Sequence, residues 1–469
     1  MLGRTRRVHF VGIGGIGMSG IAELLANLGY VVTGSDAQRS AVTDRLGTLG
    51  IAVSYGHRAE HVEGADVVVV SSAVRPANPE VVEAARRHIP VIPRAEMLAE
   101  LMRLRFAIAV AGAHGKTTTT SMIAVMLERA GLDPTAVIGG RLQAFGSNAR
   151  LGRGDLMVAE ADESDRSFLK LYPTVAVMTN IDVEHLENYR GFEDLKQAFV
   201  EFANKVPFYG SVVACADDEH VRSVLPRITR RVTTYGLDGP ADITATDVTL
   251  APNRVSATIA RLTSDGPTAL GVLTMPIPGR HNLQNALAAV AVGLDLDLSF
   301  DRIASGLGEF RGVERRFDVR GEPNGILVVD DYGHHPTEIA AVLAAARTFG
   351  RRTIVTFQPH RYTRTAALMH AFGPALSAAD RIVLTDIYAA GEDPVPGVTI
   401  DTLAASIRST GASSVDVVRR IDDVVPFLAG ILQPGDIALM LGAGSIGSLA
   451  DRLVARLSAT RDTVRSATP

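Results

Sequence analysis

Short apolar runs alternate with segments whose apolar residues recur at helical spacing along most of the chain. In the first hundred residues, this pattern predicts strands at Val8–Val11, Tyr30–Thr33, Val67–Val70 and Val91–Ile92. Strands that alternate with helices are typical of a parallel sheet. We therefore expect an α/β domain over residues 1–104, which ends in a helix over Pro93–Leu104.

A second domain is predicted over residues 105–312, and it begins with the nearly all-apolar strand Arg105–Ala111. Further apolar runs predict core strands at Asp155–Glu160, Thr174–Asn180 and Ser211–Ala216. The stretch Ala241–Pro276 instead alternates apolar and polar residues around a turn, which indicates an antiparallel meander at the edge of the sheet. A helix is expected over Leu283–Leu294.

A third domain is expected over residues 313–469, again with alternating strands and helices. Its predicted strands are Ile326–Val329, Thr353–Phe357, Arg381–Thr385 and Ile437–Leu441. The fold class is therefore α/β in three domains, with a central domain of phosphate-loop type that carries an antiparallel edge.

Composition narrows the functional classes. The net charge of −4 over 469 residues gives no basic field for nucleic acid, and a single cysteine excludes an intrachain disulfide framework. That cysteine, Cys215, lies in a predicted strand and is expected to be buried and inert. Arginines near the N-terminus imitate a secretion signal, but the apolar run after them is broken by five glycines. We expect a cytoplasmic protein with no membrane insertion.

The first glycine motif, Gly12-Ile13-Gly14-Gly15-Ile16-Gly17, follows the first strand and opens the helix Met18–Leu28. Asp36 ends the second strand, near the position of the ribose-binding acid of dinucleotide folds. Strand, glycines, helix and acid together indicate a site for a nucleotide diphosphate. The ligand can be NAD or another nucleotide diphosphate, and the bland alternative is a glycine turn packed under a helix.

The second glycine motif, Gly112-Ala113-His114-Gly115-Lys116-Thr117, lies between a strand and the helical segment Thr118–Arg129. Glycines let backbone N–H groups turn toward phosphate oxygens, and the helix N-terminus adds a positive field. Lys116 can reach the outer phosphates, and the Thr117 hydroxyl can bind Mg²⁺. Val110 occupies the position of the first glycine in the full motif. The alternative is an ordinary strand-to-helix turn with a surface lysine.

Two acidic clusters follow predicted strands of the central domain, at Glu160–Asp165 and at Asn180–His185. Mg²⁺ prefers oxygen ligands, so Glu160 at the strand end can face a metal held by Thr117. His185 can bind a second ion or orient a carboxylate, or it can be a partly buried histidine in a salt bridge. The other acids of both clusters are expected to form solvated surface.

The third domain offers polar clusters at Asp330–Pro336 and Gln358–Arg364, again after strands. Arg361 and Arg364 lie three residues apart and can share a helix face, where they can bind a carboxylate or phosphate or form structural ion pairs. Gly442–Gly447 repeats the glycine spacing near the C-terminus. We expect a close-packed turn there, with an anion site as the alternative.

Together these motifs resemble the Mur ligases of peptidoglycan assembly over nearly the whole chain. The similarity is carried by Val11–Glu23, Gly112–Thr119, Glu160–Asp165, Thr179–Ile181, Gly279–Ala286, Asp330–Glu338 and Gln358–Thr365. Within the family, the Gly-Ile-Gly-Gly-Ile-Gly-Met-Ser opening and His185–Tyr189 favour the branch that adds L-alanine over the ligase that recycles murein tripeptide.

The resemblance implies an ATP-dependent, Mg²⁺-dependent ligase that joins L-alanine to UDP-N-acetylmuramate through an acyl phosphate, as a monomer or weak homodimer. It also implies that the first and third domains are Rossmann-like. It implies ATP-binding residues at Gly112, Ala113, His114, Gly115, Lys116, Thr117, Thr118, Asn282, Asn285 and Arg316. It implies UDP-substrate contacts at Gly14, Gly15, Ile16, Gly17, Asp36, Ser71 and Asn148. Amino-acid contacts are implied at Tyr332, His334, Arg361 and Arg364, metal ligands at Thr117, Glu160 and His185, and catalytic roles for Lys116, His185, His334 and Arg364.

The chain also departs from the family pattern. Ala113 replaces a usual threonine, and Ser445 replaces a usual aspartate.

Two other classes of protein compete with a ligase: an NAD-dependent oxidoreductase, and a nucleotide-binding protein without catalysis. The oxidoreductase leaves the Lys116 loop and both acidic clusters without a role, and the intact Lys116, Thr117, Glu160 and His185 argue against a protein without catalysis. Since the predicted sites are spread over three domains, we expect closure on binding.

Overall fold

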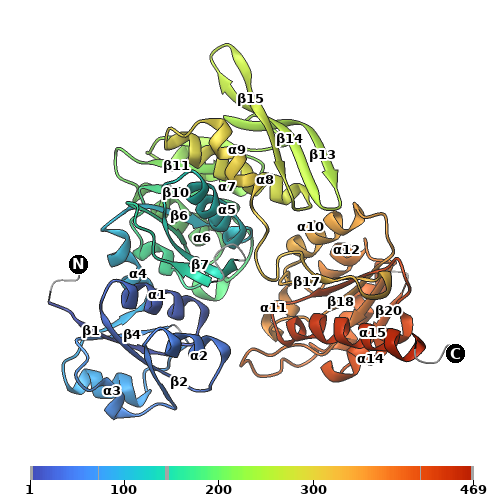
Figure 1. Ribbon diagram of the computed structural model, residues 1–469, viewed down its shortest axis with the longest axis horizontal. Coiled ribbons are helices and arrows are strands. Elements are labelled where there is room, and N and C mark those ends of the chain that lie inside the picture. Colours follow the sequence, from blue (N-terminus) through green and yellow to red (C-terminus); the bar gives the residue numbers. More distant parts are fainter. Residues whose placement is uncertain (1–3, 72, 143–146, 412–413, 466–469) are drawn as a thin grey trace. The chain divides into compact units, whose positions relative to one another are not determined.

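The computed structural model describes residues 4–71, 73–142, 147–411 and 414–465. The chain divides into two compact units, Met1–Val248 with Ser256–Met275 and Leu283–Arg311, and Thr249–Val255 with Pro276–Asn282 and Gly312–Pro469. Three β-sheets are present, each flanked by helices (Figure 1). The predicted α/β class with three domains is confirmed, while the domain boundaries after residues 104 and 312 stay predictions.

The N-terminal sheet has five parallel strands in the order β3-β2-β1-β4-β5. Its strands are β1 (Arg7–Val11), β2 (Val31–Asp36), β3 (Ala52–Tyr55), β4 (Val67–Val70) and β5 (Val91–Pro93). Its helices are α1 (Ile16–Asn27), α2 (Ala41–Thr48), η1 (Ala59–Val62), α3 (Pro79–Arg86) and α4 (Arg94–Met102). The strand order reverses between β1 and β4, and ligands of such sheets bind beyond the strand ends at this point.

The central sheet has ten strands in the order β15-β14-β13-β12-β11-β10-β6-β9-β7-β8. Its strands are β6 (Phe106–Ala111), β7 (Thr135–Leu142), β8 (Ser147–Arg150), β9 (Leu156–Glu160), β10 (Val175–Met178), β11 (Ser211–Cys215), β12 (Val232–Tyr235), β13 (Ile243–Ala251), β14 (Arg254–Thr263) and β15 (Gly266–Met275). Its helices are α5 (Lys116–Arg129), η2 (Ser167–Lys170), η3 (Leu186–Asn188), α6 (Phe192–Asn204), α7 (Glu219–Val224), η4 (Leu225–Arg227), α8 (Arg280–Asp295) and α9 (Phe300–Gly308).

Strands β13, β14 and β15 are neighbours joined by two-residue connections, as an antiparallel meander requires, and they form one edge of the central sheet (Figure 1). The predicted edge is therefore confirmed. The opposite edge, where β8 pairs antiparallel with β7, was not predicted. Gly139, Gly140 and Arg141 interrupt the apolar pattern of β7, which hides the strand in the sequence.

The C-terminal sheet has six strands in the order β16-β17-β21-β18-β19-β20, with only β16 antiparallel to its neighbour. Its strands are β16 (Asp318–Gly321), β17 (Leu327–Asp331), β18 (Thr353–Phe357), β19 (Arg381–Leu384), β20 (Val415–Val417) and β21 (Ile437–Leu441). Its helices are η5 (Pro323–Gly325), α10 (Pro336–Arg347), α11 (Tyr362–Ala367), α12 (Phe372–Leu376), α13 (Ile400–Ser409), α14 (Ile421–Ile431), η6 (Ser445–Ser448) and α15 (Leu449–Arg465).

Alternate residues of the C-terminal strands supply two separate cores because successive side chains of a strand point to opposite faces. Val329 and Val355 pack in a cluster with residues of α10, α12 and α13, whereas Val328 and Ile354 pack with residues of α14 and α15. This burial on both faces explains why the strands are continuous apolar runs in the sequence. Within the described ranges, no helix combines the length and apolarity that crossing a bilayer demands.

Candidate functional site

The phosphate loop of the central domain connects β6 to α5, as the sequence predicts. Val110 is fully buried inside β6 and pairs with Glu160 of β9, so the loop begins only at Gly112. The glycine that the full motif has at position 110 would therefore fall within a core strand. This accounts for the departure from the motif without loss of the turn itself.

Gly112 and Gly115 give the loop its shape. Their φ angles of +142° and +79° lie in the region that favours glycine. A Cβ on Gly112 would lie 2.0 Å from Thr179 Oγ1, and a Cβ on Gly115 would lie 2.7 Å from Asn285 Oδ1. The two positions therefore allow a close backbone cradle that no larger residue could form.

Lys116 begins α5, and its ammonium folds back over the loop. Nζ donates to the carbonyl oxygens of Gly112 at 2.6 Å and Ala113 at 3.2 Å, and to Glu163 Oε1 at 2.8 Å. Burial disfavours the ammonium, but Glu163 together with Asp162 and Glu160 raises the pKa of Lys116 above its usual value. The lysine therefore stays positively charged at the mouth of the loop.

Glu163 is the buried partner of this lysine and corrects an expectation from the sequence. Only 2% of Glu163 and 8% of Glu184 is exposed, so the expectation of solvated surface was wrong for these two acids. Burial raises the pKa of Glu163 to about 7, Lys116 opposes this shift, and Asp162 adds to it. Its Oε2 is buried without a hydrogen-bond partner among the described residues. The sequence signal that was missed is its position three residues after Glu160, in the turn beyond β9.

Thr117 and Glu160 meet at the start of α5, as expected for a shared metal ion. Thr117 Oγ1 donates to both carboxylate oxygens of Glu160, at 3.2 and 3.0 Å, and the Gly139 N–H donates to Glu160 Oε2 at 2.8 Å. A hydroxyl and a carboxylate are the oxygen donors that Mg²⁺ prefers. The donor set therefore fits Mg²⁺, and the glycine cradle with Lys116 fits the phosphates of ATP.

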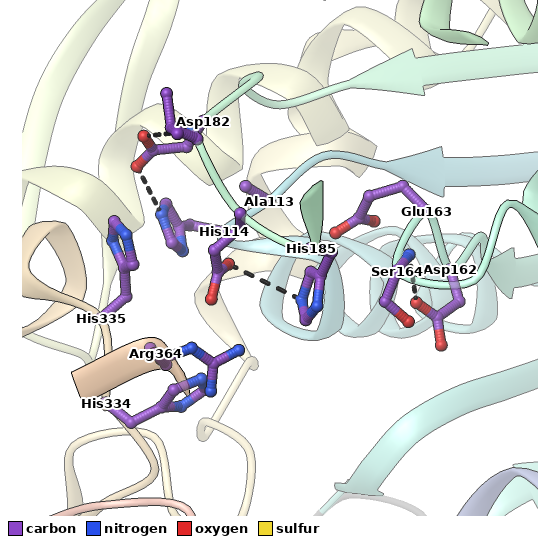
Figure 2. Close-up of polar contacts among 12 residues, drawn as sticks. Ala113, His114, Asp162, Glu163, Ser164, Asp182, His185, His334, His335 and Arg364 are labelled. Atoms are coloured by element: carbon purple, nitrogen blue, oxygen red, sulfur yellow. Dashed lines mark hydrogen bonds and ion pairs between the residues drawn. The ribbon is translucent and has the colours of Figure 1, made fainter. Parts of the chain in front are cut away.

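Residues after β10 hold the phosphate loop from the other side. Thr179 Oγ1 and Asn180 Nδ2 both donate to the His114 carbonyl oxygen, at 2.6 and 3.0 Å, and the His114 N–H donates to Asn180 Oδ1 at 2.8 Å. His114 Nε2 lies 2.9 Å from Asp182 Oδ2 (Figure 2). The Ala113 N–H donates to the Asn180 carbonyl oxygen at 3.2 Å. Ala113, which replaces the usual threonine, is therefore held in the loop through its backbone.

His185 has a left-handed backbone with φ of +57° and lies among acids. Its Nε2 lies 3.9 Å from Glu184 Oε2, and its Nδ1 lies 3.8 Å from Glu187 Oε1. These contacts match the salt-bridged alternative from the sequence and are also compatible with an ion. The metal role of His185 stays a prediction.

The first glycine loop lies at the strand reversal of the N-terminal sheet. The Gly14 N–H donates to Asp36 Oδ2 at 2.8 Å, so Asp36 lies at the loop as the sequence predicts. Ser71 follows β4, and a Cβ on Gly12 would lie 4.0 Å from its hydroxyl. Gly15 caps α1 and Gly17 lies in its first turn. The side chains of Ile16 and Asn148 lie outside the described part of the structure.

Gly17 makes room for an arginine of another helix. A Cβ on Gly17 would lie 2.3 Å from Nη1 of Arg94, the first residue of α4. Arg94 Nη2 also lies 3.6 Å from Asp162 Oδ2, and the Ser164 N–H donates to Asp162 Oδ1 at 3.0 Å (Figure 2). Arg94 therefore contacts both the first glycine loop and the acidic turn after β9. It was not identified from the sequence.

In the C-terminal unit, Tyr332 and His334 follow β17 directly. His334 Nδ1 lies 3.2 Å from the Tyr332 carbonyl oxygen, and the His334 N–H donates to Glu338 Oε2 at 3.0 Å. A carbonyl oxygen only accepts, so Nδ1 carries the proton in this arrangement. Nε2 is then the ring nitrogen that can accept a proton when the imidazole is uncharged.

Arg361 and Arg364 have different partners. Arg361 Nε lies 3.0 Å from Glu392 Oε1, which is the structural ion pair that the sequence left open. Arg364 Nη1 lies 3.3 Å from His360 Nδ1. Burial, with nearby His334 and the two arginines, lowers the pKa of His360 to about 4, so this ring is neutral. Contacts of both arginines with an amino acid stay predictions.

The remaining residues expected at ATP lie at α8 and after α9. Asn282 is buried, and its Nδ2 donates to the Pro278 carbonyl oxygen at 2.7 Å. Helix α8 begins at Arg280, three residues before the expected start, because Gly279 turns the chain with φ of +99°. Arg316 lies over the Tyr332 ring and 3.5 Å from Glu338 Oε1.

The third glycine loop, Gly442–Gly447, is a close-packed turn, the first of the two alternatives. Gln358 Oε1 accepts from the Ile446 N–H at 3.0 Å, and Gln358 Nε2 lies 3.1 Å from Ser445 Oγ. A Cβ on Gly444 would lie 2.7 Å from Gln358 Oε1. A side-chain amide thus occupies the place where an anion would bind, and Ser445 contributes to holding it.

Cys215 is also as expected, since it is buried and burial raises its pKa to about 11.

Comparison with known proteins covers nearly the whole chain. Three family models match in succession: Mur ligase family, catalytic domain (residues 7–106), Mur ligase middle domain (110–293), and Mur ligase, glutamate ligase domain (315–444). UDP-N-acetylmuramate–L-alanine ligases of Geobacter sp. (strain M21) and Geotalea daltonii are each 54% identical, over 98% and 97% of this chain and 100% and 99% of their own lengths. The crystal structure of UDP-N-acetylmuramate-alanine ligase from Thermotoga maritima matches with a TM-score of 0.82 and 30% identity, over 97% of this chain and 99% of that one.

Proposed function

Because this chain belongs to the Mur ligase family, we propose that it joins L-alanine to the carboxylate of UDP-N-acetylmuramate, with conversion of ATP to ADP and phosphate. The names of its full-length relatives supply the two substrates. This reaction would place the enzyme in peptidoglycan synthesis.

The observation that carries the proposal is the arrangement of the phosphate loop. Lys116 keeps its charge at the loop mouth, and one residue further on the Thr117 hydroxyl contacts Glu160. A cation for phosphate oxygens and an oxygen pair for Mg²⁺ are the parts that phosphoryl transfer needs. A dehydrogenase has no use for either.

In the first step, an oxygen of the muramic carboxylate attacks the γ-phosphorus of ATP. The bond between this phosphorus and the β–γ bridging oxygen breaks, which releases ADP and leaves an acyl phosphate. Lys116 neutralises charge that develops on the transferred group, and the N–H groups of Gly115 and its neighbours hold the phosphates. When bound by Thr117 and Glu160, Mg²⁺ supplies further charge neutralisation at these phosphates.

In the second step, the amine nitrogen of L-alanine attacks the acyl carbon, and the bond from that carbon to the phosphate oxygen breaks. The attacking amine must lose a proton. His334 is suited to accept it, since its Nδ1 is turned to the Tyr332 carbonyl oxygen and Nε2 is the basic nitrogen. Arg364 would bind the carboxylate of the amino acid.

An ADP-release assay tests the proposal. The full chain is incubated with ATP, Mg²⁺ and UDP-N-acetylmuramate. L-alanine, glycine, L-serine or a murein tripeptide is added to separate reactions as the fourth component. We expect the fastest release with L-alanine and a product heavier than the sugar nucleotide by one alanine residue. Release only with the tripeptide would assign the chain to the recycling branch instead.

A titration tests the competing oxidoreductase. The glycine loop after β1 should bind UDP and should not respond to NAD. Saturable binding of NAD without binding of UDP would contradict the ligase proposal.

A further inference from the structure

A buried carboxylate lies beneath the first glycine loop and has no part in the chemistry above. Glu80 is the second residue of α3 and is fully buried. Its two carboxylate oxygens contact groups from two strands, β1 and β2, and from the segment 57–61 that follows β3. These contacts are His9 Nε2 at 3.3 Å, Ser35 Oγ at 2.6 Å, the Arg58 N–H at 3.2 Å, His61 Nδ1 at 2.9 Å and His57 Nδ1 at 3.4 Å.

Burial of a carboxylate costs folding free energy unless each of its oxygens accepts hydrogen bonds. Here burial acts to raise the pKa of Glu80, but hydrogen bonds from His9, Ser35 and His61 outweigh it and lower the pKa to about 2. The N-terminus of α3 also favours a negative charge. Glu80 is therefore an anion at every pH where the enzyme would work, inside a domain that could have placed an apolar residue there.

Ser35 connects this carboxylate to the glycine loop. Its hydroxyl donates to Glu80, while its carbonyl oxygen accepts from the N–H groups of Gly12 at 2.8 Å and Ile13 at 2.9 Å. The next residue, Asp36, accepts from the Gly14 N–H at 2.8 Å. Three successive N–H groups of the loop are thus held by the end of β2, and the side chain of Ser35 is fixed by Glu80.

His57 ties the same point to β3. Its Nδ1 lies 3.1 Å from Ser35 Oγ as well as 3.4 Å from Glu80 Oε1. His9 reaches Glu80 from β1 and contacts Thr33 Oγ1 of β2 at 2.8 Å through its other nitrogen. Glu80 therefore joins the carboxyl ends of β2 and β3 to β1, the strand that leads into the loop.

From this geometry we infer that Glu80 is a positioning residue for the nucleotide diphosphate site. It acts through Ser35 to hold the backbone of Gly12, Ile13 and Gly14, and with it the turn at which the diphosphate binds. The inference rests on the proposed function in one respect, since it takes a UDP-linked sugar as the ligand of this loop.

The test measures binding of UDP to the full chain by calorimetry, together with KM for UDP-N-acetylmuramate, KM for ATP and kcat. Variants are Glu80→Gln, Ser35→Ala and the double variant. Glu83→Gln is the matched control, because Glu83 lies in the same helix but pairs with Arg86 and Arg87. Thermal unfolding verifies that each variant is folded.

We expect Glu80→Gln and Ser35→Ala each to weaken UDP binding and raise KM for UDP-N-acetylmuramate about tenfold, with kcat and KM for ATP within about twofold of wild type. In the double variant, UDP binding should be weakened by a smaller factor than the product of the two single effects, since both substitutions remove the same hydrogen bond between Ser35 and Glu80. Glu83→Gln should bind UDP as wild type does. If Glu80→Gln does not fold, Ser35→Ala alone decides.

Three results would overturn the inference. UDP affinity could be unchanged in Ser35→Ala and Glu80→Gln. Alternatively, kcat could fall and KM for ATP could rise together with the loss of UDP affinity, which is the pattern of a purely structural residue. Failure of the wild-type chain to bind UDP would overturn it together with the proposed function. Wild-type binding with unaffected variants would overturn the positioning role alone.

Discussion

Lys116 and Glu163 form a buried ion pair across the mouth of the phosphate loop, with Nζ 2.8 Å from Oε1. The same ammonium is held by the Gly112 carbonyl oxygen at 2.6 Å. A carboxylate of the protein thus lies where the lysine would meet a phosphate oxygen. Lys116 follows β6 and Glu163 follows β9, each after a short turn, and the two strands are neighbours in the sheet.

Replacement of Lys116 by alanine should abolish ATP turnover. Loss of a cation at the transferred phosphoryl group costs about 10²–10³-fold in kcat or more. Phosphate release is the measurement, and circular dichroism should show a folded protein. Lys170→Ala is the control, because Lys170 is half exposed and lies in a surface pair with Glu96. Wild-type phosphate release by Lys116→Ala would contradict the assignment of the loop.

Replacement of Glu163 by glutamine should change how stability depends on pH. The pKa of Glu163 is raised from 4.5 to about 7, so the folded protein binds this proton more tightly than the unfolded chain. The stabilisation is complete below about pH 4.5 and is lost as the pH rises through about 7. Wild type should therefore lose more Tm between pH 5 and 8 than Glu163→Gln does, as followed by calorimetry. Parallel curves for the two proteins would show that Glu163 is already ionised at acidic pH.

Two threonines of α5 should respond in opposite ways to replacement by valine. Thr117→Val removes the hydroxyl that contacts Glu160, so we expect a raised requirement for Mg²⁺ and a fall in kcat of about 10²-fold. Thr119 is fully buried, and its hydroxyl has no hydrogen-bond partner among the described residues. Thr119→Val should keep activity and leave the free energy of unfolding unchanged or raise it by up to about 1 kcal/mol. Equal loss of activity in both variants would point to helix packing instead of a metal ligand.

Gly112→Ala should disrupt the phosphate loop. The φ angle of +142° and a Cβ 2.0 Å from Thr179 Oγ1 make the native backbone inaccessible to alanine. We expect a loss of more than about 1 kcal/mol in stability, measured by urea unfolding, and no detectable ATP binding. Gly47→Ala is the control, because Gly47 lies inside α2 with open space around it and should gain about 0.5–1 kcal/mol.

The sequence predicted the parts of the site that local patterns encode. Apolar runs located the core strands, and the spacing of two glycines and a lysine located the phosphate loop at Lys116. Both are short-range features of the sequence, because a strand, a turn and a helix each form from neighbouring residues. Asp36 was found for the same reason, since it ends a strand at a typical distance from the first glycines. The resemblance to a family then joined these pieces into one reaction.

Partners that depend on tertiary packing were not predicted. Glu163 is one of several acids in a polar run, and its position three residues after Glu160 does not by itself show that it is buried. Glu80 lies at the start of an ordinary surface-type helix, and its histidine contacts come from positions 19 to 71 residues away. The Gly139-Gly140 pair hid β7, because the two glycines interrupt its apolar run although the strand lies between β9 and β8 in the sheet.

The absence of a side chain at position 17 is a consequence of the guanidinium beside it. The motif is usually explained by close packing of its own helix against its own strand, but here the space belongs to Arg94, whose Nη1 would lie 2.3 Å from any added carbon. The two positions are therefore constrained as a pair. Since Nη1 is the far end of a flexible side chain, alanine or serine at 17 should require the Arg94 guanidinium to move, and a shorter residue at 94 should remove that requirement. A screen of single substitutions would then record an effect at position 17 whose origin lies 77 residues further along the chain.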